Sequence, residues 1–186
     1  GDRMKNASIA ILGALLVAGL SGCAASPAES AAHESPKAQA SENPYGGFPV
    51  DPPAADEIIL TIVGPKETDE YTMAQLEKLV TDPVTIFEPF VKAEQTFSGV
   101  PLKTLFEAAG ISSNDKISTL ALNAYKYDDT AGNFTSNRGI LALRRDSQLI
   151  PMDQGGPIRI IFPTNTKYFS FLDAWNWSLR SIKVIE

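Results

Sequence analysis

The sequence of 186 residues contains one cysteine and one histidine, Cys23 and His33, and both precede residue 50. The long segment that follows therefore offers neither a thiolate nor an imidazole. This excludes Ser-His-Asp and Cys-His nucleophiles from that segment, together with cysteine-based zinc and iron–sulfur sites. Because His33 has no second ligand or orienting partner beside it, we expect no metal or catalytic role for it.

Oxygen ligands are the next candidates for chemistry. Asp128, Asp129 and Asn133 lie close together in the sequence and resemble a loose set of calcium ligands. Their spacing departs from an EF-hand loop, which needs oxygens at alternate positions and a glutamate at its end. We therefore interpret residues 128–133 as a polar turn. Gly155-Gly156-Pro157 fits either an anion-binding nest or, more simply, a tight turn that leads into a buried strand.

Positive and aromatic side chains give two further groupings. Arg138, Arg144 and Arg145 form the densest cluster of positive charge. This cluster fits an anion or partner site, or alternatively a solvated strand edge. Trp175 and Trp177 alternate with a polar residue, which predicts one tryptophan in the core and one exposed as a candidate interface anchor.

The N-terminal residues have the pattern of an export signal. Met4-Lys5-Asn6 precedes an apolar run over residues 7–20, which is typical of a secretory signal peptide and too short to span a bilayer comfortably. The run closes on Leu20-Ser21-Gly22-Cys23, which resembles the bacterial lipobox. We predict a lipoprotein signal peptide at 4–22 and lipid attachment at Cys23. The alternative is an ordinary signal peptide with a chance cysteine.

These features predict a location and a mode of attachment. Acyl chains on Cys23 would anchor the protein to the bacterial cell membrane, facing the extracytoplasmic side. Residues 23–55 are rich in Ala, Ser, Pro and Glu without hydrophobic periodicity, which predicts a disordered stalk. The chain is acidic, with a formal net charge of −6. We therefore expect no nucleic-acid partner, and the lipid anchor rather than charge should provide the contact with the membrane.

Residues 56–186 are predicted to fold as one α+β domain with mixed β-sheets and short helices. Thr72 and Gln75 form a capping box before a helix that ends near Val80. A second helix should open around residues 99–102, with Pro101 at its first helical position and Gly110 at its end. The expected strands are 57–63, 83–91, 117–125, 157–162 and 181–185, whereas residues 139–145 fit either a strand or a short helix.

Three segments carry a longer pattern. They are FSGVPL at 97–102 with its continuation to Gly110, LAL at 141–143 with GGPIRIIFP at 155–163, and WSLRSIK at 177–183. In this order and spacing they resemble the molybdopterin-binding domain of the sulfite oxidase family. The resemblance spans most of residues 56–186 and implies the α+β fold of that family.

The resemblance also implies a metal ligand that this chain does not have. In catalytic members a cysteine thiolate binds molybdenum shortly upstream of the Gly-Val-Pro-Leu motif. The matching stretch, Val84–Thr96, contains Thr85, Phe87 and Glu88 but no cysteine. Glu88 or Glu94 could offer an oxygen, but a hard carboxylate is a poor replacement for a thiolate. We expect both glutamates to be solvated surface residues and predict no metal ligands and no catalytic residues.

The same resemblance implies a place for the phosphate of the pterin. It corresponds to Arg180, Ser181 and Lys183, whose side chains suit phosphate contacts. The alternative is that Arg180 and Lys183 are outward positions of an edge strand, where charge discourages aggregation. Molybdopterin is a possible ligand only by resemblance, and we expect no resident cofactor.

Together these features predict a membrane-tethered, extracytoplasmic, non-catalytic binding module that takes a small anionic ligand or a protein partner. The alternative is a molybdopterin-dependent oxidoreductase. A third interpretation is a subunit that completes its site with a partner chain.

Overall fold

The computed structural model describes residues 50–186, and the statements below concern that part of the chain. The predicted signal peptide at 4–22, the predicted lipid attachment at Cys23, His33 and most of the predicted stalk lie outside the described residues. Residues 50–59 contain no helix or strand. Among the described residues, no helix is long and apolar enough to cross a membrane.

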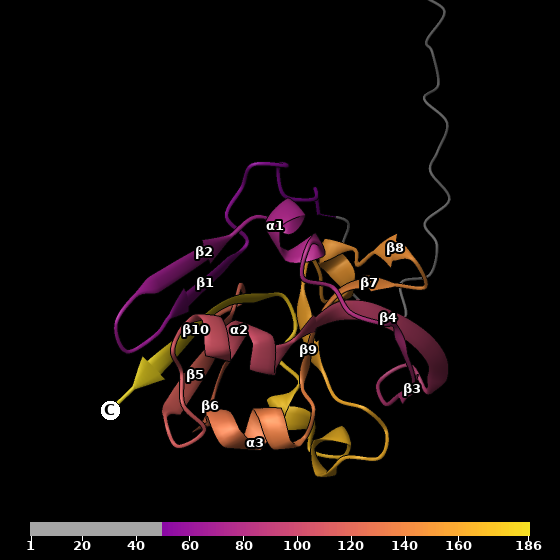
Figure 1. Cartoon of the computed structure of the whole chain (residues 1–186). Helices are drawn as coiled ribbons and strands as arrows, with labels where there is room; N and C mark the ends of the chain where they lie inside the picture. Colours follow the sequence, from indigo (N-terminus) through magenta and orange to yellow (C-terminus); the bar gives the residue numbers. More distant parts are fainter. Residues whose placement is uncertain (1–49) are drawn as a thin grey trace, which may run out of the picture. The chain divides into compact units, whose positions relative to one another are not determined.

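The described residues form short helices among many strands (Figure 1), which confirms the predicted α+β class. In chain order the elements are β1 (Leu60–Val63), β2 (Thr68–Tyr71), α1 (Met73–Glu77), β3 (Val84–Glu88), β4 (Ala93–Pro101), α2 (Leu102–Ala108), β5 (Lys116–Ala121), β6 (Lys126–Thr130), α3 (Ala131–Ser136), β7 (Ile140–Arg145), β8 (Gln148–Leu149), η1 (Met152–Gln154), β9 (Arg159–Ile161), η2 (Lys167–Phe169), η3 (Leu172–Ala174) and β10 (Leu179–Ile185), where η marks a 3-10 helix.

The first sheet has the order β2-β1-β10-β5-β6. β10 pairs parallel with β1 and antiparallel with β5, so the last strand lies at the centre of the sheet. The interpretation of Arg180 and Lys183 as edge-strand charges is therefore wrong, because β10 is paired with another strand on each side. The register of β10 shifts between Leu179 and Ser181, which places Arg180 at a β-bulge. Bulges re-aim side chains out of the regular alternation of a strand.

The second sheet has the order β3-β4-β7-β8, and β9 also pairs with β7. β4 follows an arc in Figure 1, and its register with β7 shifts between Ser98 and Gly99. The two strands approach closely there, because a Cβ on Gly99 would lie 2.1 Å from the carbonyl oxygen of Leu141. Only glycine fits this position. The outer strands β3 and β9 of this curved sheet lie close enough for a side-chain contact.

The helices follow their local signals with small shifts. Thr72 and Gln75 form the predicted capping box, although α1 ends at Glu77 and not near Val80. In α2 the buried face is Leu102, Leu105 and Phe106. Pro101 is not the first helical residue: it is the last residue of β4 and caps α2, since the extended pairing with β7 continues to that point. Gly110 follows α2 with φ of +68°, as expected for a left-handed helix end.

The polar turn predicted at residues 128–133 is wrong. Asp128, Asp129 and Thr130 belong to β6 and pair with β5, and Thr130 caps α3, which follows directly. The carboxylate of Asp129 accepts hydrogen bonds from the Tyr127 and Tyr168 hydroxyls, the Asn133 amide and the Thr130 N–H. Burial raises the pKa of Asp129, but these bonds outweigh it and hold the pKa below its usual value. Asp129 is therefore a junction between β6, α3 and η2 and not a cation ligand in a loop.

Candidate functional site

A fully buried ion pair includes Glu88, which lies within the stretch Val84–Thr96 where the resemblance implies a metal ligand. Nη2 of Arg159 donates to Oε1 of Glu88 at 2.9 Å, and both side chains are 0% exposed. The prediction that Glu88 is a solvated surface glutamate is thus wrong. Glu94 is exposed, as predicted. Glu88 ends β3 and Arg159 begins β9, so the pair joins two outer strands of the same curved sheet.

The second carboxylate oxygen of Glu88 is also occupied. Oε2 accepts the backbone N–H groups of Phe90 at 2.8 Å and Val91 at 2.7 Å. These bonds fix the turn that leads from β3 to β4. A carboxylate that is removed from water needs such partners, because burial of an unsatisfied charge is very costly. Glu88 therefore has both oxygens committed to the protein.

Aromatic rings surround the guanidinium of Arg159. Its Cζ lies 4.1 Å from the ring centroid of Trp177 and 5.8 Å from that of Phe97. Trp177 also packs against Gly155, where a Cβ would meet its ring atoms at 3.2 Å and where φ is +87°. The turn interpretation of Gly155-Gly156-Pro157 therefore agrees with the structure, and the absence of a side chain at Gly155 makes room for Trp177.

The donor set at this position does not fit a thiolate-held metal. Residues 50–186 contain no cysteine or histidine, and both oxygens of Glu88 are engaged by Arg159 and backbone amides. In the described part of the chain, no three Asp or Glu side chains gather in a way that could hold a metal ion. A metal at Glu88 would have to break a buried ion pair, so the residues present do not suit the family's metal centre.

Next to the ion pair is a cavity with aromatic walls, called the aromatic cavity below. It has a volume of about 380 Å³, within the range of small-molecule sites, which is about 300–1,000 Å³. The side chains that matter for its chemistry are Phe90, Tyr125, Leu172, Asp173, Trp175 and Trp177. The prediction of one exposed tryptophan is wrong, since Trp175 is 3% exposed, Trp177 is half-buried and both line this cavity.

Arg180 lines a second cavity of about 370 Å³, called the Arg180 cavity below. Its walls include Pro53, Glu57 and Met152, so it combines one cationic and one anionic side chain. Arg180 and Lys183 are exposed and Ser181 is half-buried. Ser181 and Lys183 do not line this cavity, so of the three predicted pterin-phosphate residues only Arg180 does. The aromatic cavity was not predicted, because its walls come from segments far apart in the sequence.

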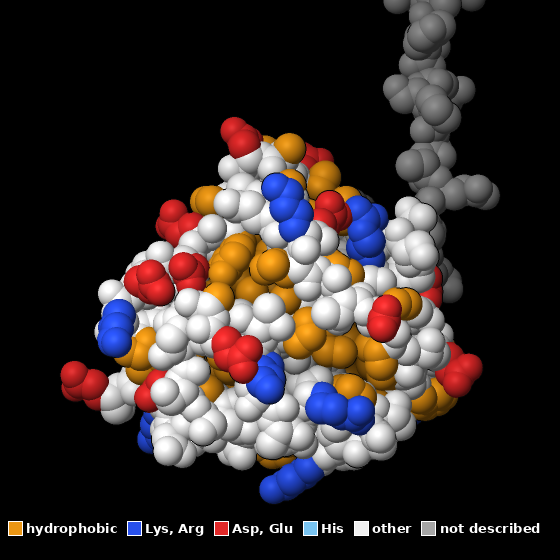
Figure 2. All heavy atoms as spheres, in the orientation of Figure 1, with side chains coloured by type: hydrophobic (Ala, Val, Ile, Leu, Met, Phe, Trp, Pro, Cys, Tyr) orange, Lys and Arg blue, Asp and Glu red, His pale blue; other side chains and the backbone are white. Residues whose placement is uncertain are grey.

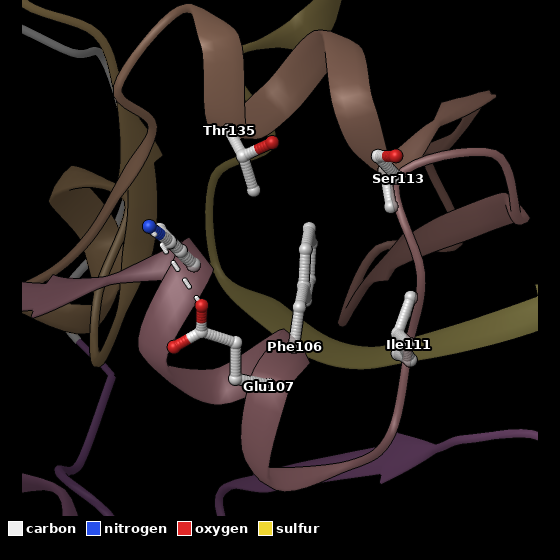
Figure 3. A pocket seen from close by; sticks show the side chains of 7 residues that line it. Phe106, Glu107, Ile111, Ser113 and Thr135 are labelled. Atoms are coloured by element: carbon white, nitrogen blue, oxygen red, sulfur yellow. Dashed lines mark ion pairs between the residues drawn. The ribbon is translucent and has the colours of Figure 1, made fainter.

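A small cavity lies between α2 and α3 (Figure 3). Phe106 points between the two helices, with Thr135 and Ser113 opposite, and an ion pair of 3.7 Å joins Lys103 to Glu107. Its volume is about 150 Å³, below the range of about 300–1,000 Å³ that is typical of small-molecule sites.

On the face shown in Figure 2, hydrophobic side chains gather between α1 and α2 and over β4, with charged side chains around them.

The predicted arginine cluster does not act as one site. Arg144 pairs with Glu77, Arg138 bonds to Asn165, and Arg145 bonds to Gln154. Each guanidinium has a partner of its own on a different element. The three charges therefore contribute separate surface contacts and do not converge on one ligand.

The mixed sheets and short helices form the α+β architecture that the resemblance implies. The sequence profile of the family "Oxidoreductase molybdopterin binding domain" matches residues 48–172, more than half of the chain. The chain belongs to this family, as the resemblance predicted. The match ends before Arg180, so it does not extend to the predicted pterin-phosphate residues. No curated protein matches the chain.

The buried pair gives a first prediction. Glu88→Gln removes one charge of a fully buried ion pair, so the free energy of unfolding should fall by about 3–5 kcal/mol, measured by urea denaturation. The matched control is Glu94→Gln, the same change at an exposed position, which should alter stability by less than about 0.5 kcal/mol. Adding Arg159→Met to Glu88→Gln should cost less than the sum of the two single changes. Equal, small losses in both glutamine variants would contradict a buried pair.

Proposed function

We propose that this protein is a non-catalytic binding module of the molybdopterin-binding oxidoreductase family. One observation carries the proposal: Glu88, in the stretch where the resemblance requires a thiolate, is buried with both oxygens engaged. Chemistry at a metal needs an available ligand that also tunes the electronics of the metal. Glu88 instead serves as a structural anion.

The module binds a small anionic ligand or a protein partner. The Arg180 cavity supports the anionic ligand, because an arginine at a β-bulge lines it and Lys183 adds positive charge further along β10. Arginine suits two-point contacts with phosphate-like groups, and lysine acts as a point charge. Glu57 on the same cavity limits this site to ligands whose negative charge lies near Arg180.

The module is tethered by lipid on Cys23 to the bacterial cell membrane and faces the extracytoplasmic side. The sequence Leu20-Ser21-Gly22-Cys23 after a basic residue and an apolar run supports this part of the proposal. Residues 23–55 would then hold the domain away from the bilayer, as a flexible linker of Ala, Ser and Pro does.

The competing function is a molybdopterin-dependent oxidoreductase, or a subunit of one, and the family match favours it. Molybdenum content decides between the two. We expect the full chain, purified from a host that makes the cofactor, to contain far less than stoichiometric molybdenum by elemental analysis and to have no sulfite or sulfoxide redox activity. A family member with the cysteine, made in the same host, controls for cofactor supply. Stoichiometric molybdenum in this chain would overturn the non-catalytic proposal.

The anionic ligand can be tested with inorganic phosphate as the probe. Titration calorimetry at low ionic strength, where exposed charges are least screened, should detect binding that disappears in the Arg180→Gln/Lys183→Gln double variant. Thermal stability should change little, because both side chains are exposed. The control is Lys66→Gln/Lys78→Gln, which removes the same charge elsewhere and should retain affinity. Unaltered affinity in the first variant would reject the Arg180 cavity as the anion site.

The anchor can be tested independently of the ligand. Cys23→Ser removes the one thiol in the sequence, so the protein should move from the membrane fraction to a soluble or unprocessed form. His33→Ala, in the same segment, should remain with the membrane. Mass spectrometry of the N-terminus of the wild-type protein measures the modification directly, and an unmodified Cys23 or a cut at another residue would contradict the anchor.

A further inference from the structure

The aromatic cavity has a charge character opposite to that of the Arg180 cavity. Four of its seven lining residues are aromatic, one is the carboxylate Asp173, and none is Lys or Arg. Phe90 and Tyr125 are 40% and 41% exposed, so the walls are open to a ligand from solvent. An apolar cavity with a few placed polar groups is the usual form of a small-molecule site.

The buried ion pair contacts two of the residues that line this cavity. Oε2 of Glu88 fixes the backbone of Phe90, and Arg159 lies against the ring of Trp177. The rings of Phe90 and Trp177 are 4.5 Å apart between centroids, at an interplanar angle of 69°. The buried ion pair thus supports two neighbouring walls, and its two charges compensate each other. The net charge at the cavity comes from Asp173.

Tyr125 and Asp173 add polar groups to the lining. The Tyr125 hydroxyl donates to the backbone carbonyl of Asp173 at 2.9 Å, which leaves oxygen lone pairs as acceptors beside the carboxylate. Burial and the Asp173 carboxylate raise the pKa of Tyr125 above its usual value. The negative charge of Asp173 therefore acts electrostatically on the aromatic residue Tyr125 in the lining. This favours a positively charged ligand in the cavity.

Trp175 is a buried aromatic residue of the cavity lining. Its Nε1 donates to the backbone carbonyl of Tyr168 at 2.8 Å, and the backbone carbonyl of Asn176 accepts the Ile160 N–H at 3.0 Å. Trp175 and Trp177 therefore keep a fixed spacing on either side of the buried Asn176. Rings that are already ordered lose little entropy when a ligand arrives.

From this arrangement we infer that the aromatic cavity binds a small organic ammonium ion, held by the aromatic rings and by Asp173. Aromatic rings attract ammonium groups, most strongly where the cation is desolvated. A neutral apolar ligand would cover the carboxylate without compensating its charge, which carries a desolvation cost. A phosphate-bearing ligand would be repelled by Asp173. This site is separate from the anion site of the proposed function, and either can exist without the other.

Choline is the probe, and its neutral isostere 3,3-dimethylbutan-1-ol is the matched ligand control. Titration of the full chain, followed by calorimetry and tryptophan fluorescence, should show saturable binding of choline, with the isostere bound at least about tenfold more weakly. The isostere has the same shape and differs in charge. Equal affinities of the two compounds would mean that the cavity recognises only apolar shape and would overturn the inference, and so would an absence of choline binding.

Variants locate the site without disturbing the buried pair. Asp173→Asn and Tyr125→Leu change exposed lining residues, and each should weaken choline binding by about three- to tenfold. Their controls are Asp82→Asn and Phe87→Leu, which make comparable changes at exposed residues outside the lining and should retain affinity. Wild-type affinity in both lining variants would overturn the site. Phosphate binding should be unaffected in all four variants. The choline site and the phosphate site can therefore be rejected independently of each other.

Discussion

The ion pair between Glu88 and Arg159 is the interaction on which this part of the molecule depends. Two charges without any solvent exposure are stable only when each has close partners, because removing ions from water costs several kcal/mol per ion. The partners come from the curved sheet: β3 supplies the carboxylate, β9 supplies the guanidinium, and the turn after β3 supplies two N–H groups. Within the same sheet, β4 shifts its register with β7 between Ser98 and Gly99, where the two strands approach closely.

A buried pair of this kind is weak evidence of net stabilisation, since well-packed apolar residues often serve as well or better. In this protein the pair determines where two other residues lie. Glu88 orders the chain at Phe90, and Arg159 backs Trp177, so the pair sets two walls of the aromatic cavity. The stretch in which the resemblance implies a metal ligand thus contains a buried charge that positions a neighbouring surface. Membership of the family therefore does not by itself decide the chemistry, because function lies in the site rather than in the fold.

Sequence reasoning predicted the features that depend on local signals or on the family motifs. The capping box of Thr72 and the left-handed Gly110 follow from neighbouring residues, and the α+β class followed from short helices predicted among many strands. It failed where distant segments meet. The partner of Glu88 is 71 residues away, so a glutamate beside a proline and a turn looked solvated. The central place of β10 depends on its pairing with β1, near the other end of the domain. Asp129 looked like a turn residue because its four hydrogen-bond donors include Tyr168, from a segment well beyond β6.

The two larger cavities next to the end of the β5 strand differ in one respect that matters for function. The Arg180 cavity carries an arginine and a glutamate, whereas the aromatic cavity carries a carboxylate and no cation among its lining residues. Leu122 lines the first and Asn123 lines the second, so consecutive residues face sites of different charge. An anionic pterin would be attracted to one and repelled by the other. A cofactor that reached both cavities would have to keep its phosphate at Arg180 and away from Asp173. The two proposals made above, an anion at Arg180 and an ammonium ion in the aromatic cavity, would together match the charge character of both cavities.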